Sequence, residues 1–384
     1  MTHVQALCEV CEIEPIITGR FGGFGGRYAP ESQIEFLQGL TALFHETLCD
    51  SGFWKEYWTL FPHEPSPLNR APRLTRLADG GQIWLKREDL SGHASNSRYH
   101  IVGQILLARR MNKTEIIMAC GSTKHGVECA SLCASLGMAC SIFVGMKDAV
   151  EQPTNIQKII NMGSSVIEVD HGGMSLREAM GEAQRAATSR FRTAFYVSIS
   201  AVGPHPYPLI VRTFQSITGS KAIHQMTENC GKLPDVVVAP VGSNGTTEGF
   251  FYPFLGFPSV RLLAVEAFGS AALCHGSQGV YSGTLTNIMQ NDDGQILHAH
   301  SLSPDMNLPA VGPELAHWAQ SDRIECSSAT TEEAVDGLKI LKDTEGFDTG
   351  LDTAHAIQKV VDIARELDND QVVLLHVSSA ENAF

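Results

Sequence analysis

The sequence predicts an α/β protein made of two three-layer α/β domains with parallel-type sheets and a cleft between them. Short apolar segments alternate with amphipathic segments of roughly 10–15 residues, which is the pattern of βαβ units. The alternation occurs in two series, one on each side of about residue 215. The chain has 384 residues, of which 43% are hydrophobic and 18% charged, and this composition favours two domains with large cores.

The N-terminal residues precede the first series. Four glycines within residues 21–26 exclude a regular helix there and imply close packing of the backbone. Residues 33–60 have the period of an amphipathic helix. Pro62, Pro65, Pro67 and Pro72 then mark an extended link into an expected strand.

The first series combines strands of five or six residues with longer helices. A tight loop is expected between the second strand and the helix that follows it, at residues 120–126. The expected strands are 82–86, 115–119, 139–144 and 165–169, and the expected helices are 97–111, 127–136, 156–162 and 175–187.

The second series repeats this order after a long unassigned stretch. Its strands are expected at 235–241, 260–266 and 371–377, and its helices from 247 and at 331–342 and 353–367. Residues 269–303 are rich in Gly, Ser, Asn and Asp and have no clear period.

The two series define the expected domains. Residues 1–215 form an N-terminal α/β domain that contains a mobile subdomain at about 112–200, and residues 216–384 form a C-terminal α/β domain. Residues 54–86 are expected to cross to the other domain.

Composition narrows the function. The net charge is −14, from 28 basic and 42 acidic residues, and no Lys/Arg-rich block occurs, which argues against nucleic acid or an anionic membrane as a partner. No run of ~18 apolar residues would span a bilayer, and the N-terminus has no signal-peptide pattern, so we expect a cytoplasmic protein.

Metal ligation is not expected either. The ten cysteines are scattered, and Cys8 and Cys11 form one pair without a second, so reduced thiols are expected. His298 and His300 lie in a polar stretch with no third ligand nearby.

Four polar stretches follow expected strands: 91–97, 120–126, 242–246 and 377–382. In open α/β sheets, ligands bind beyond the carboxyl ends of the strands. Because the four stretches share this position, we expect them to converge on a single site.

The loop Gly121-Ser122-Thr123-Lys124-His125 precedes an expected helix. Free backbone N–H groups and the helix dipole favour an anion there, by ~0.3–1 kcal/mol for the dipole. Lys124 adds a full positive charge, so the loop is a candidate anion site. The alternative is that Ser122 or Thr123 is an ordinary N-cap and Lys124 is solvated.

The turn Gly242-Ser243-Asn244-Gly245-Thr246 also joins a strand to a helix and is a second candidate for holding an anion. It matches neither the nucleotide pattern G-x-x-x-x-G-K-[ST] nor the dinucleotide pattern G-x-G-x-x-G. A simple tight turn with a Thr N-cap explains it equally well.

His93, His100, His125 and His376 all lie near expected strand or helix ends. A single histidine is more often a hydrogen-bonded structural residue than a catalytic one. Several near one expected cleft raise the prospect that one acts as an acid or base.

Sequence pieces spread over residues 19–378 resemble the tryptophan synthase β subunit, a pyridoxal-phosphate (PLP) enzyme of fold type II. The matching pieces are FGGFGGRYAPE (21–31), WLKREDL (84–90), GQILLARRM (103–111), GPHPYPLIVRTFQ (203–215), LPDVVVAPVG (233–242), DDGQI (292–296), LPAVGPE (308–314) and TEGF (344–347). The resemblance implies the two-domain cleft, a homodimer and a possible α-subunit-like partner.

The resemblance also places the family's site groups on this chain. Its Schiff-base lysine falls on Ser97, the phosphate-binding histidine before it on Asn96, and its proton-transfer glutamate on Ala119. The substrate-carboxylate loop becomes Gly121–His125. The serine and asparagine of the phosphate cradle fall on Gly245 and Thr246.

Three further family positions complete the comparison. An aspartate of the mobile loop falls on Asn307. The serine that bonds the pyridine nitrogen matches Ser378, and a nearby glutamate matches Glu345.

The replacement of several cofactor groups together leads us to expect no cofactor. Our main hypothesis is a PLP-independent enzyme that acts on an indole or another aromatic or carboxylate-bearing molecule by cyclisation, condensation or isomerisation. Lys124 and the Gly121–Thr123 amides would hold a carboxylate or oxyanion. His125 or His100 would be the acid or base, and Ser97 a donor or nucleophile. Asn96, Ser243, Asn244 and Glu248 would complete the binding site.

Two alternatives remain at this point. The chain is a non-catalytic regulatory subunit of a tryptophan synthase-like complex, or it is a PLP-dependent lyase. In the second case it would use Lys124 or hold PLP without a covalent bond.

Overall fold

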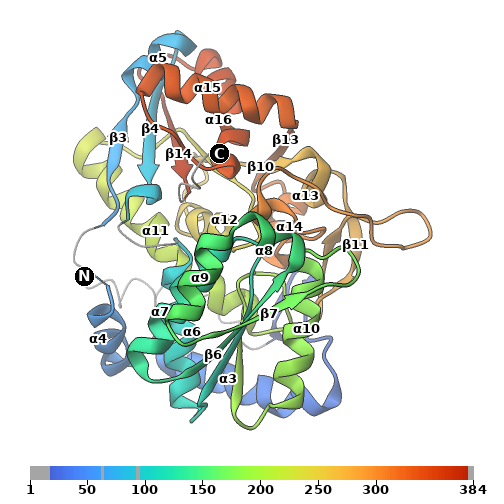
Figure 1. Ribbon diagram of the computed structural model, residues 1–384. Helices are drawn as coiled ribbons and strands as arrows, with labels where there is room; N and C mark the ends of the chain where they lie inside the picture. The colour runs from blue at the N-terminus through green and yellow to red at the C-terminus, as the bar shows by residue number, and fades with distance from the viewer. Residues whose placement is uncertain (1–17, 62–64, 92–95, 379–384) are drawn as a thin grey trace.

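The computed structural model describes residues 18–61, 65–91 and 96–378. The larger sheet has six strands in the order β13-β10-β9-β14-β4-β3 and lies in the upper lobe of Figure 1. All neighbouring pairs are parallel except β3 with β4. Its strands are β3 (Leu68–Arg70), β4 (Gln82–Arg87), β9 (Val236–Pro240), β10 (Arg261–Ala267), β13 (Glu325–Ala329) and β14 (Val372–Val377).

This sheet is covered by helices on both faces, so its strands are apolar throughout. Along β9, Val237 and Ala239 pack into one hydrophobic cluster, and Val236 and Val238 into the other. Helices on the first face are α11 (Tyr207–Cys230), α12 (Thr246–Phe251), α13 (Ala272–His275) and α14 (Pro313–Gln320), and those on the second are α5 (Pro72–Ala78), α15 (Thr331–Glu345) and α16 (Leu351–Glu366).

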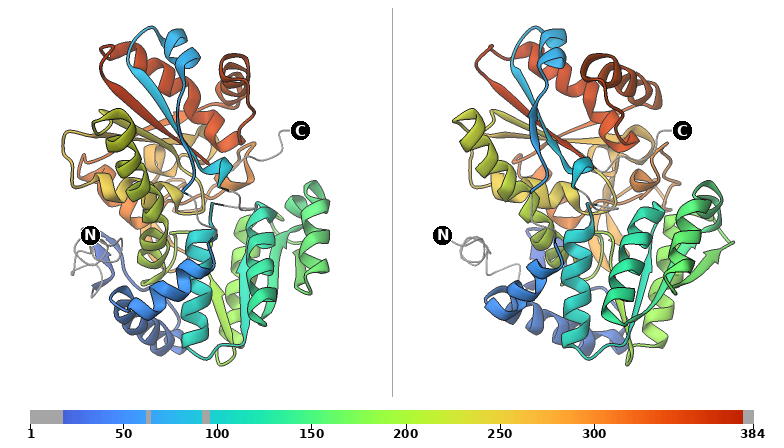
Figure 2. Two further views of the ribbon diagram at one scale, coloured as in Figure 1. Left: turned by 90° about the vertical axis from the view of Figure 1, so that its left-hand side faces the viewer. Right: turned by 60° about the vertical axis from the view of Figure 1, so that its left-hand side comes forward.

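The second sheet is four-stranded, fully parallel and ordered β7-β6-β5-β8, in the lower lobe (Figures 1 and 2). Helices α7 and α10 both contact its central strands. Its elements are α6 (Arg98–Arg110), β5 (Glu115–Ala119), α7 (Thr123–Leu136), β6 (Ala139–Gly145), α8 (Met146–Glu151), α9 (Pro153–Asn161), β7 (Ser165–Val169), α10 (Leu176–Ser189) and β8 (Ala194–Val197).

A third, antiparallel sheet joins the chain's first described residues to a hairpin from the second half, in the order β1-β2-β12-β11. Its strands are β1 (Arg20–Phe21), β2 (Phe24–Gly25), β11 (Ser277–Tyr281) and β12 (Thr284–Ile288). The hairpin falls in residues 269–303, where we expected no regular structure. Short strands with a turn at Ser282-Gly283 give too little period to detect.

The single helix expected over 33–60 is two helices, α3 (Glu31–Leu48) and α4 (Ser51–Thr59). Asp50 separates them because its side chain caps α4 by accepting the Gly52 N–H. Helix α7 begins at Thr123 rather than 127, so Lys124 and His125 lie in its first turn and not in a free loop.

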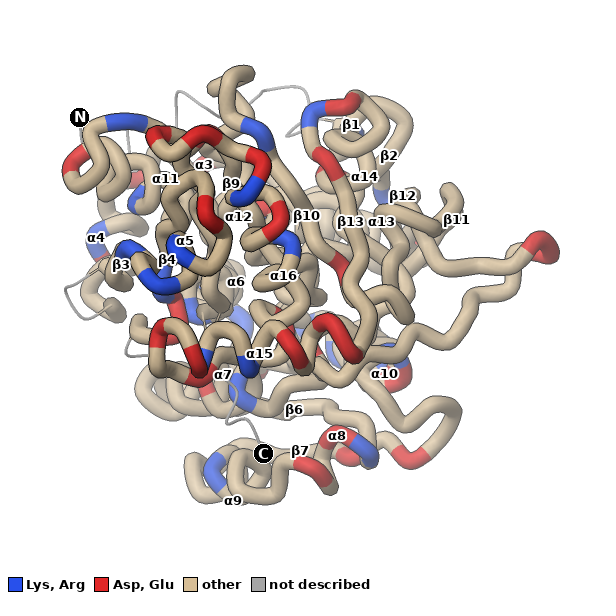
Figure 3. The backbone as a smooth tube through the Cα atoms, turned by 90° about the horizontal axis from the view of Figure 1, so that it is seen from above, with Lys and Arg blue, Asp and Glu red and all other residues tan. Residues whose placement is uncertain are grey.

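The α/β fold with mixed and parallel sheets is confirmed. Strand β4 belongs to the larger sheet, where it pairs with β14. The residues that follow it, 98–197, build the smaller sheet. Basic and acidic residues are interspersed along the chain seen from above in Figure 3. Among the described helices, none is both long and apolar enough to cross a membrane.

Candidate functional site

Hydrogen bonds and charge interactions connect the loops that follow three strands. His125, after β5, and Ser243, after β9, both contact Asp305 of a short 3₁₀ turn, η4 (Pro304–Met306). Asp352 of α16 bonds Ser378, after β14, and feels the charges of Asp305 and Lys124. These contacts link residues from three of the four polar stretches that follow expected strands.

The first turn of α7 holds a carboxylate from within the chain. His125 Nε2 lies 2.9 Å from Asp305 Oδ1, and the Ser122 N–H donates to the same carboxylate. The Thr123 N–H instead donates to Gln152 Oε1 at 2.8 Å. The Ser122 and Thr123 N–H groups of this turn are thus both bonded to side chains of the protein.

Asp305 is buried yet remains ionised. The positive charge of His125 and its hydrogen bond, with Lys124 and the Ser122 N–H, hold the pKa of Asp305 below its ordinary value against the opposing effect of burial. Its backbone carbonyl accepts the Ser243 N–H at 2.5 Å. Asp305 therefore connects the turn after β5, in the four-stranded parallel sheet, to the turn after β9, in the six-stranded sheet.

Ser378 lies in a small network with α16. Its hydroxyl donates to Asp352, and its N–H donates to Thr353 Oγ1 at 3.1 Å. Burial raises the pKa of Asp352 to about 6, and the Asp305 charge adds to this effect while the Ser378 hydrogen bond and Lys124 oppose it. Asp352 thus titrates near neutral pH.

His100 is fixed in one neutral tautomer. The Gln104 amide donates to Ser198 O and accepts the Ser198 N–H, so its orientation is set by the backbone. Gln104 Nε2 also lies 2.9 Å from His100 Nδ1, which must therefore be an acceptor. The hydrogen is left on Nε2. Burial, with the nearby His125, lowers the pKa of His100 to about 3.

Several buried polar atoms near these strand ends have no hydrogen-bond partner within the described part of the chain. They are both amide atoms of Asn96, Nε2 of His100 and Oγ of Ser122. The three residues are at most 3% exposed. Ser97, the N-cap position of α6, is fully buried beside Asn96. Unpartnered buried polar atoms cost ~1–3 kcal/mol each, so such a group is typical of a ligand site.

The turn before α12 is tight. Gly245 has φ +66°, and a Cβ there would lie 2.3 Å from Val211. Thr246 Oγ1 donates to Asn244 Oδ1 at 2.8 Å, and Gly242 starts the turn beside the Asp305 carbonyl. The turn is therefore held by its own side chains.

Glu248 is buried behind this turn. Its carboxyl group accepts the Gly312 N–H, while its Oε2 has no partner. Burial raises its pKa to about 8, so the group is largely protonated at neutral pH.

Other predicted residues lie elsewhere. Glu345 accepts the Arg73 and Leu74 N–H groups and so caps α5. Asn307 follows η4 and buries an unpartnered Oδ1. His376 packs on Phe250, with ring centroids 4.5 Å apart, in the core of the larger sheet. His93 and residues 379–382 lie outside the described residues.

A cavity of about 530 Å³ is linked to His100 only through Ser198 and Gln104, and its wall contains none of the predicted site residues. It lies among α3, α10 and the β11–β12 turn, and Ser198, whose backbone orients Gln104, lines it. Its other walls are largely apolar and include Phe36, Leu37 and Tyr207.

Sequence reasoning missed Asp305, Asp352, Gln104 and Gln152. Asp305 lies just after the stretch without a clear period, and Asp352 and Gln104 lie inside helices, so none has a distinguishing local pattern. Their roles come from tertiary contacts between segments about 30 to 180 positions apart.

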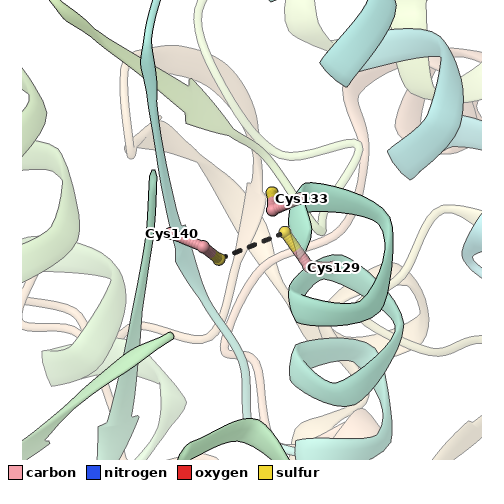
Figure 4. A group of neighbouring side chains, drawn as sticks. All are labelled: Cys129, Cys133 and Cys140. Atoms are coloured by element: carbon pink, nitrogen blue, oxygen red, sulfur yellow. Dashed lines mark hydrogen bonds between the residues drawn. The ribbon is translucent and has the colours of Figure 1, made fainter. Parts of the chain in front are cut away.

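Three cysteines could hold a metal ion among the described residues. The Sγ atoms of Cys129, Cys133 and Cys140 all lie within 4.8 Å of one another, with 4.0 Å between Cys129 and Cys140 (Figure 4). That spacing suits soft cations. All three thiols are free and belong to the hydrophobic core with Leu132 and Ile142. Core packing therefore accounts for them.

The fold and these contacts define a two-sheet α/β protein whose candidate site lies at the carboxyl ends of its parallel strands. The family model described as "Pyridoxal-phosphate dependent enzyme" matches residues 60–378. The chain belongs to this family.

Comparisons with individual proteins agree with this assignment. The chain is 40% identical over 370 residues to a protein named tryptophan synthase from Saccharomyces cerevisiae, covering 94% of this chain and 52% of that protein. It thus spans about half the length of this curated relative.

Two solved structures share the fold. An L-serine ammonia-lyase from Rhizomucor miehei has a TM-score of 0.66 at 17% identity, over 83% of this chain and 95% of that one. The processed form of threonine deaminase isoform 2 from Solanum lycopersicum has a TM-score of 0.65 at 16% identity, over 94% of this chain and 87% of that one.

The family corrects one expectation. We expected no cofactor because several PLP-binding groups of the tryptophan synthase β subunit are replaced here. The matching family is defined by its dependence on PLP, so PLP, rather than no cofactor, is indicated. The expectation of no cofactor rested on the joint replacement of these groups, at Asn96, Ser97, Ala119, Gly245 and Thr246, but other polar groups remain at the strand ends.

The residues at these strand ends fit PLP. Ser378 and Asp352 offer a hydroxyl and a carboxyl group for the ring nitrogen. Asn96 and Ser122 offer unpartnered donors for the phosphate. Of the predicted site residues, Lys124 is the one that carries an amine.

Proposed function

We propose that this protein is a PLP-dependent enzyme that acts on a small aromatic molecule bearing an amine. The observation that carries the proposal is the group of unpartnered polar atoms of Asn96, His100 and Ser122, buried where the strands end. When bound, PLP supplies an electron sink for bond cleavage next to an amine. Lys124 is our candidate for its covalent attachment.

The charges around Lys124 support this role. Lys124 is half-buried, and its charge is felt by Asp305 and Asp352, where it favours the ionised form of each carboxyl group. Ser378 is bonded to Asp352.

Proton transfer is best assigned to His125. Asp305 accepts a hydrogen bond from its Nε2 and so fixes the ring, as an orienting carboxylate does for a general base. His100 has a different role, because Gln104 leaves it only an Nε2–H donor. We propose that His100 donates to an oxygen of the ligand.

The aromatic part of the proposed substrate is supported by the neighbouring cavity. Its walls are largely apolar, and at about 530 Å³ it is within the usual range for small-molecule pockets. Ser198 connects its wall to His100 through Gln104.

The experiment is reconstitution with PLP, followed by desalting and near-UV/visible spectroscopy. We expect wild type to retain PLP absorbance and to release the cofactor as a covalent adduct after borohydride reduction and digestion, on a peptide that contains Lys124. Lys124→Ala should lose the adduct. Lys158→Ala, at an exposed lysine on α9, is the control and should keep it.

Two results would count against this proposal. If wild type retains no PLP after desalting, the cofactor assignment to this chain fails. If the adduct forms on a lysine other than Lys124, the attachment residue is wrong, although the PLP enzyme stands.

We also propose that the protein forms a homodimer that pairs with an α-subunit-like protein. The support is the resemblance to the tryptophan synthase β subunit, together with the 40% identity over 370 residues to a protein named tryptophan synthase. Light scattering after size exclusion tests the dimer. A mass corresponding to one chain would exclude it.

A further inference from the structure

The first turn of α7 is a built anion site whose ligand comes from the chain itself. The Ser122 N–H and His125 Nε2 both bond the Asp305 carboxylate, and Lys124 contributes its positive charge. Gln152 takes the remaining Thr123 N–H. A second carboxylate entering this turn would find the Ser122 and Thr123 N–H groups and His125 Nε2 engaged, with the Ser122 hydroxyl left unpartnered among the described residues.

Asp305 is held in this position by its backbone. Its carbonyl accepts the Ser243 N–H, and the carbonyl of Pro304 lies 3.1 Å from the position that a Cβ on Gly121 would take. The η4 turn is therefore packed tightly between the turns that follow β5 and β9. Asp305 as a whole is 4% exposed, so its carboxylate is not a solvated surface group.

The local charge opposes a further anion. Asp352 lies near Asp305, and Asp148 also feels its charge, while Lys124 and His125 are the nearby basic groups. A further carboxylate beside Asp305, Asp352 and Asp148 is unfavourable unless one of these acids is removed, because like charges in a buried site repel strongly.

We propose that Asp305 is a specificity-determining residue that occupies the carboxylate position of the site, so that the enzyme selects amines without a neighbouring carboxylate over α-amino acids. The inference rests on the proposed function, since it names the substrate class of that site. Removing the Asp305 carboxylate should open a vacant anion site.

L-tryptophan and tryptamine form a matched pair of aromatic probes, because they differ only by the carboxylate. Calorimetry on PLP-loaded protein should give at least ~10-fold tighter binding of tryptamine than of L-tryptophan in wild type. In Asp305→Ala the preference should fall by at least the same factor. A ratio that is equal in wild type and variant overturns the proposal.

A second measurement needs no PLP and therefore separates this inference from the proposed function. Acetate should fill the space left in Asp305→Ala and raise its melting temperature by about 2–4 °C above an equal concentration of chloride, with no such difference in wild type. Asp305→Asn, which keeps the shape, shows whether the turn still folds. Equal effects of acetate and chloride in Asp305→Ala contradict the inference.

If PLP is not retained but acetate stabilises Asp305→Ala, the anion site stands and the cofactor assignment falls. If PLP is retained and both Asp305 tests are negative, the enzyme proposal stands without this specificity. Asp293→Ala, at an acidic residue exposed in a turn, is the control and should behave as wild type in both measurements.

Discussion

At the residue scale, buried carboxyl groups dominate the chemistry of the site. Sequence reasoning located Lys124 and His125, because they follow a strand and precede a helix. It could not find their partner Asp305, since that contact joins positions 180 apart in the chain. It also left the role of His100 open, which only the orientation of the Gln104 amide decides.

The pH dependence of stability follows from the buried carboxyl groups whose pKa values are raised. Burial raises the pKa of Glu248 from 4.5 to about 8, that of Asp148 from 3.8 to about 7 and that of Asp352 from 3.8 to about 6. The folded state therefore binds protons more tightly than the unfolded state. Their contribution to stability is complete below about pH 4 and is lost as pH rises through these values.

We predict that, between pH 5.5 and 8.5, the stability contribution of Glu248 falls by on the order of 1 kcal/mol per pH unit while it titrates. Glu248→Gln removes this proton and should flatten the dependence, measured by urea unfolding at the two pH values. Glu228→Gln, at an exposed position on α11, should leave the slope unchanged. An equal slope in wild type and Glu248→Gln would show that Glu248 is not titrating there.

At the element scale, strands that form continuous apolar runs and helices with a clear period could be predicted, whereas short strands and a helix buried on all sides could not. Strand β5 falls where the apolar run predicted it, at Glu115–Ala119. Helix α11 was missed because its first three turns are buried on all sides, so they show no polar face. The β11–β12 hairpin was missed because only some of its alternating residues are buried.

Close packing of α11 against α12 leads to a second prediction. A Cβ on Gly219 would lie 2.3 Å from the Phe250 carbonyl oxygen, so alanine cannot fit without moving the backbone. We expect Gly219→Ala to lower the free energy of unfolding by about 1–3 kcal/mol, despite the better helix propensity of alanine. Gly256→Ala, with nothing within 4 Å, is the control. Equal stabilities in urea would contradict tight packing there.

At the scale of the whole molecule, the two lobes are not separate in sequence. Strand β4, from the first half, lies between β3 and β14 and pairs with β14 along six positions. Residues 54–86 were expected to cross to the other domain; β3, α5 and β4 lie with the larger sheet, whereas α4 packs in the core of the other lobe. We propose residue 215 as the domain boundary with this crossing segment as an exception.

This topology predicts how fragments behave. Residues 216–384 alone leave one edge of β14 unpaired and should show no cooperative unfolding transition by circular dichroism. Residues 65–91 carry β3, α5 and β4. Fusing them to 216–384 through a flexible linker should restore a cooperative transition, because β4 pairs with the free edge of β14 and α5 packs against α16. A cooperative transition in 216–384 alone would show that the crossing segment is dispensable.

The central position of β14 has a consequence for biosynthesis. The last strand of the described chain, Val372–Val377, lies between β9 and β4. At ~5–20 residues per second, a ribosome needs about 15–60 s to pass from the end of β4 to the end of β14. During that time the edge of β4 that later pairs with β14 exposes unpaired backbone N–H and C=O groups. We therefore expect the nascent chain to need protection of this edge until β14 has been made.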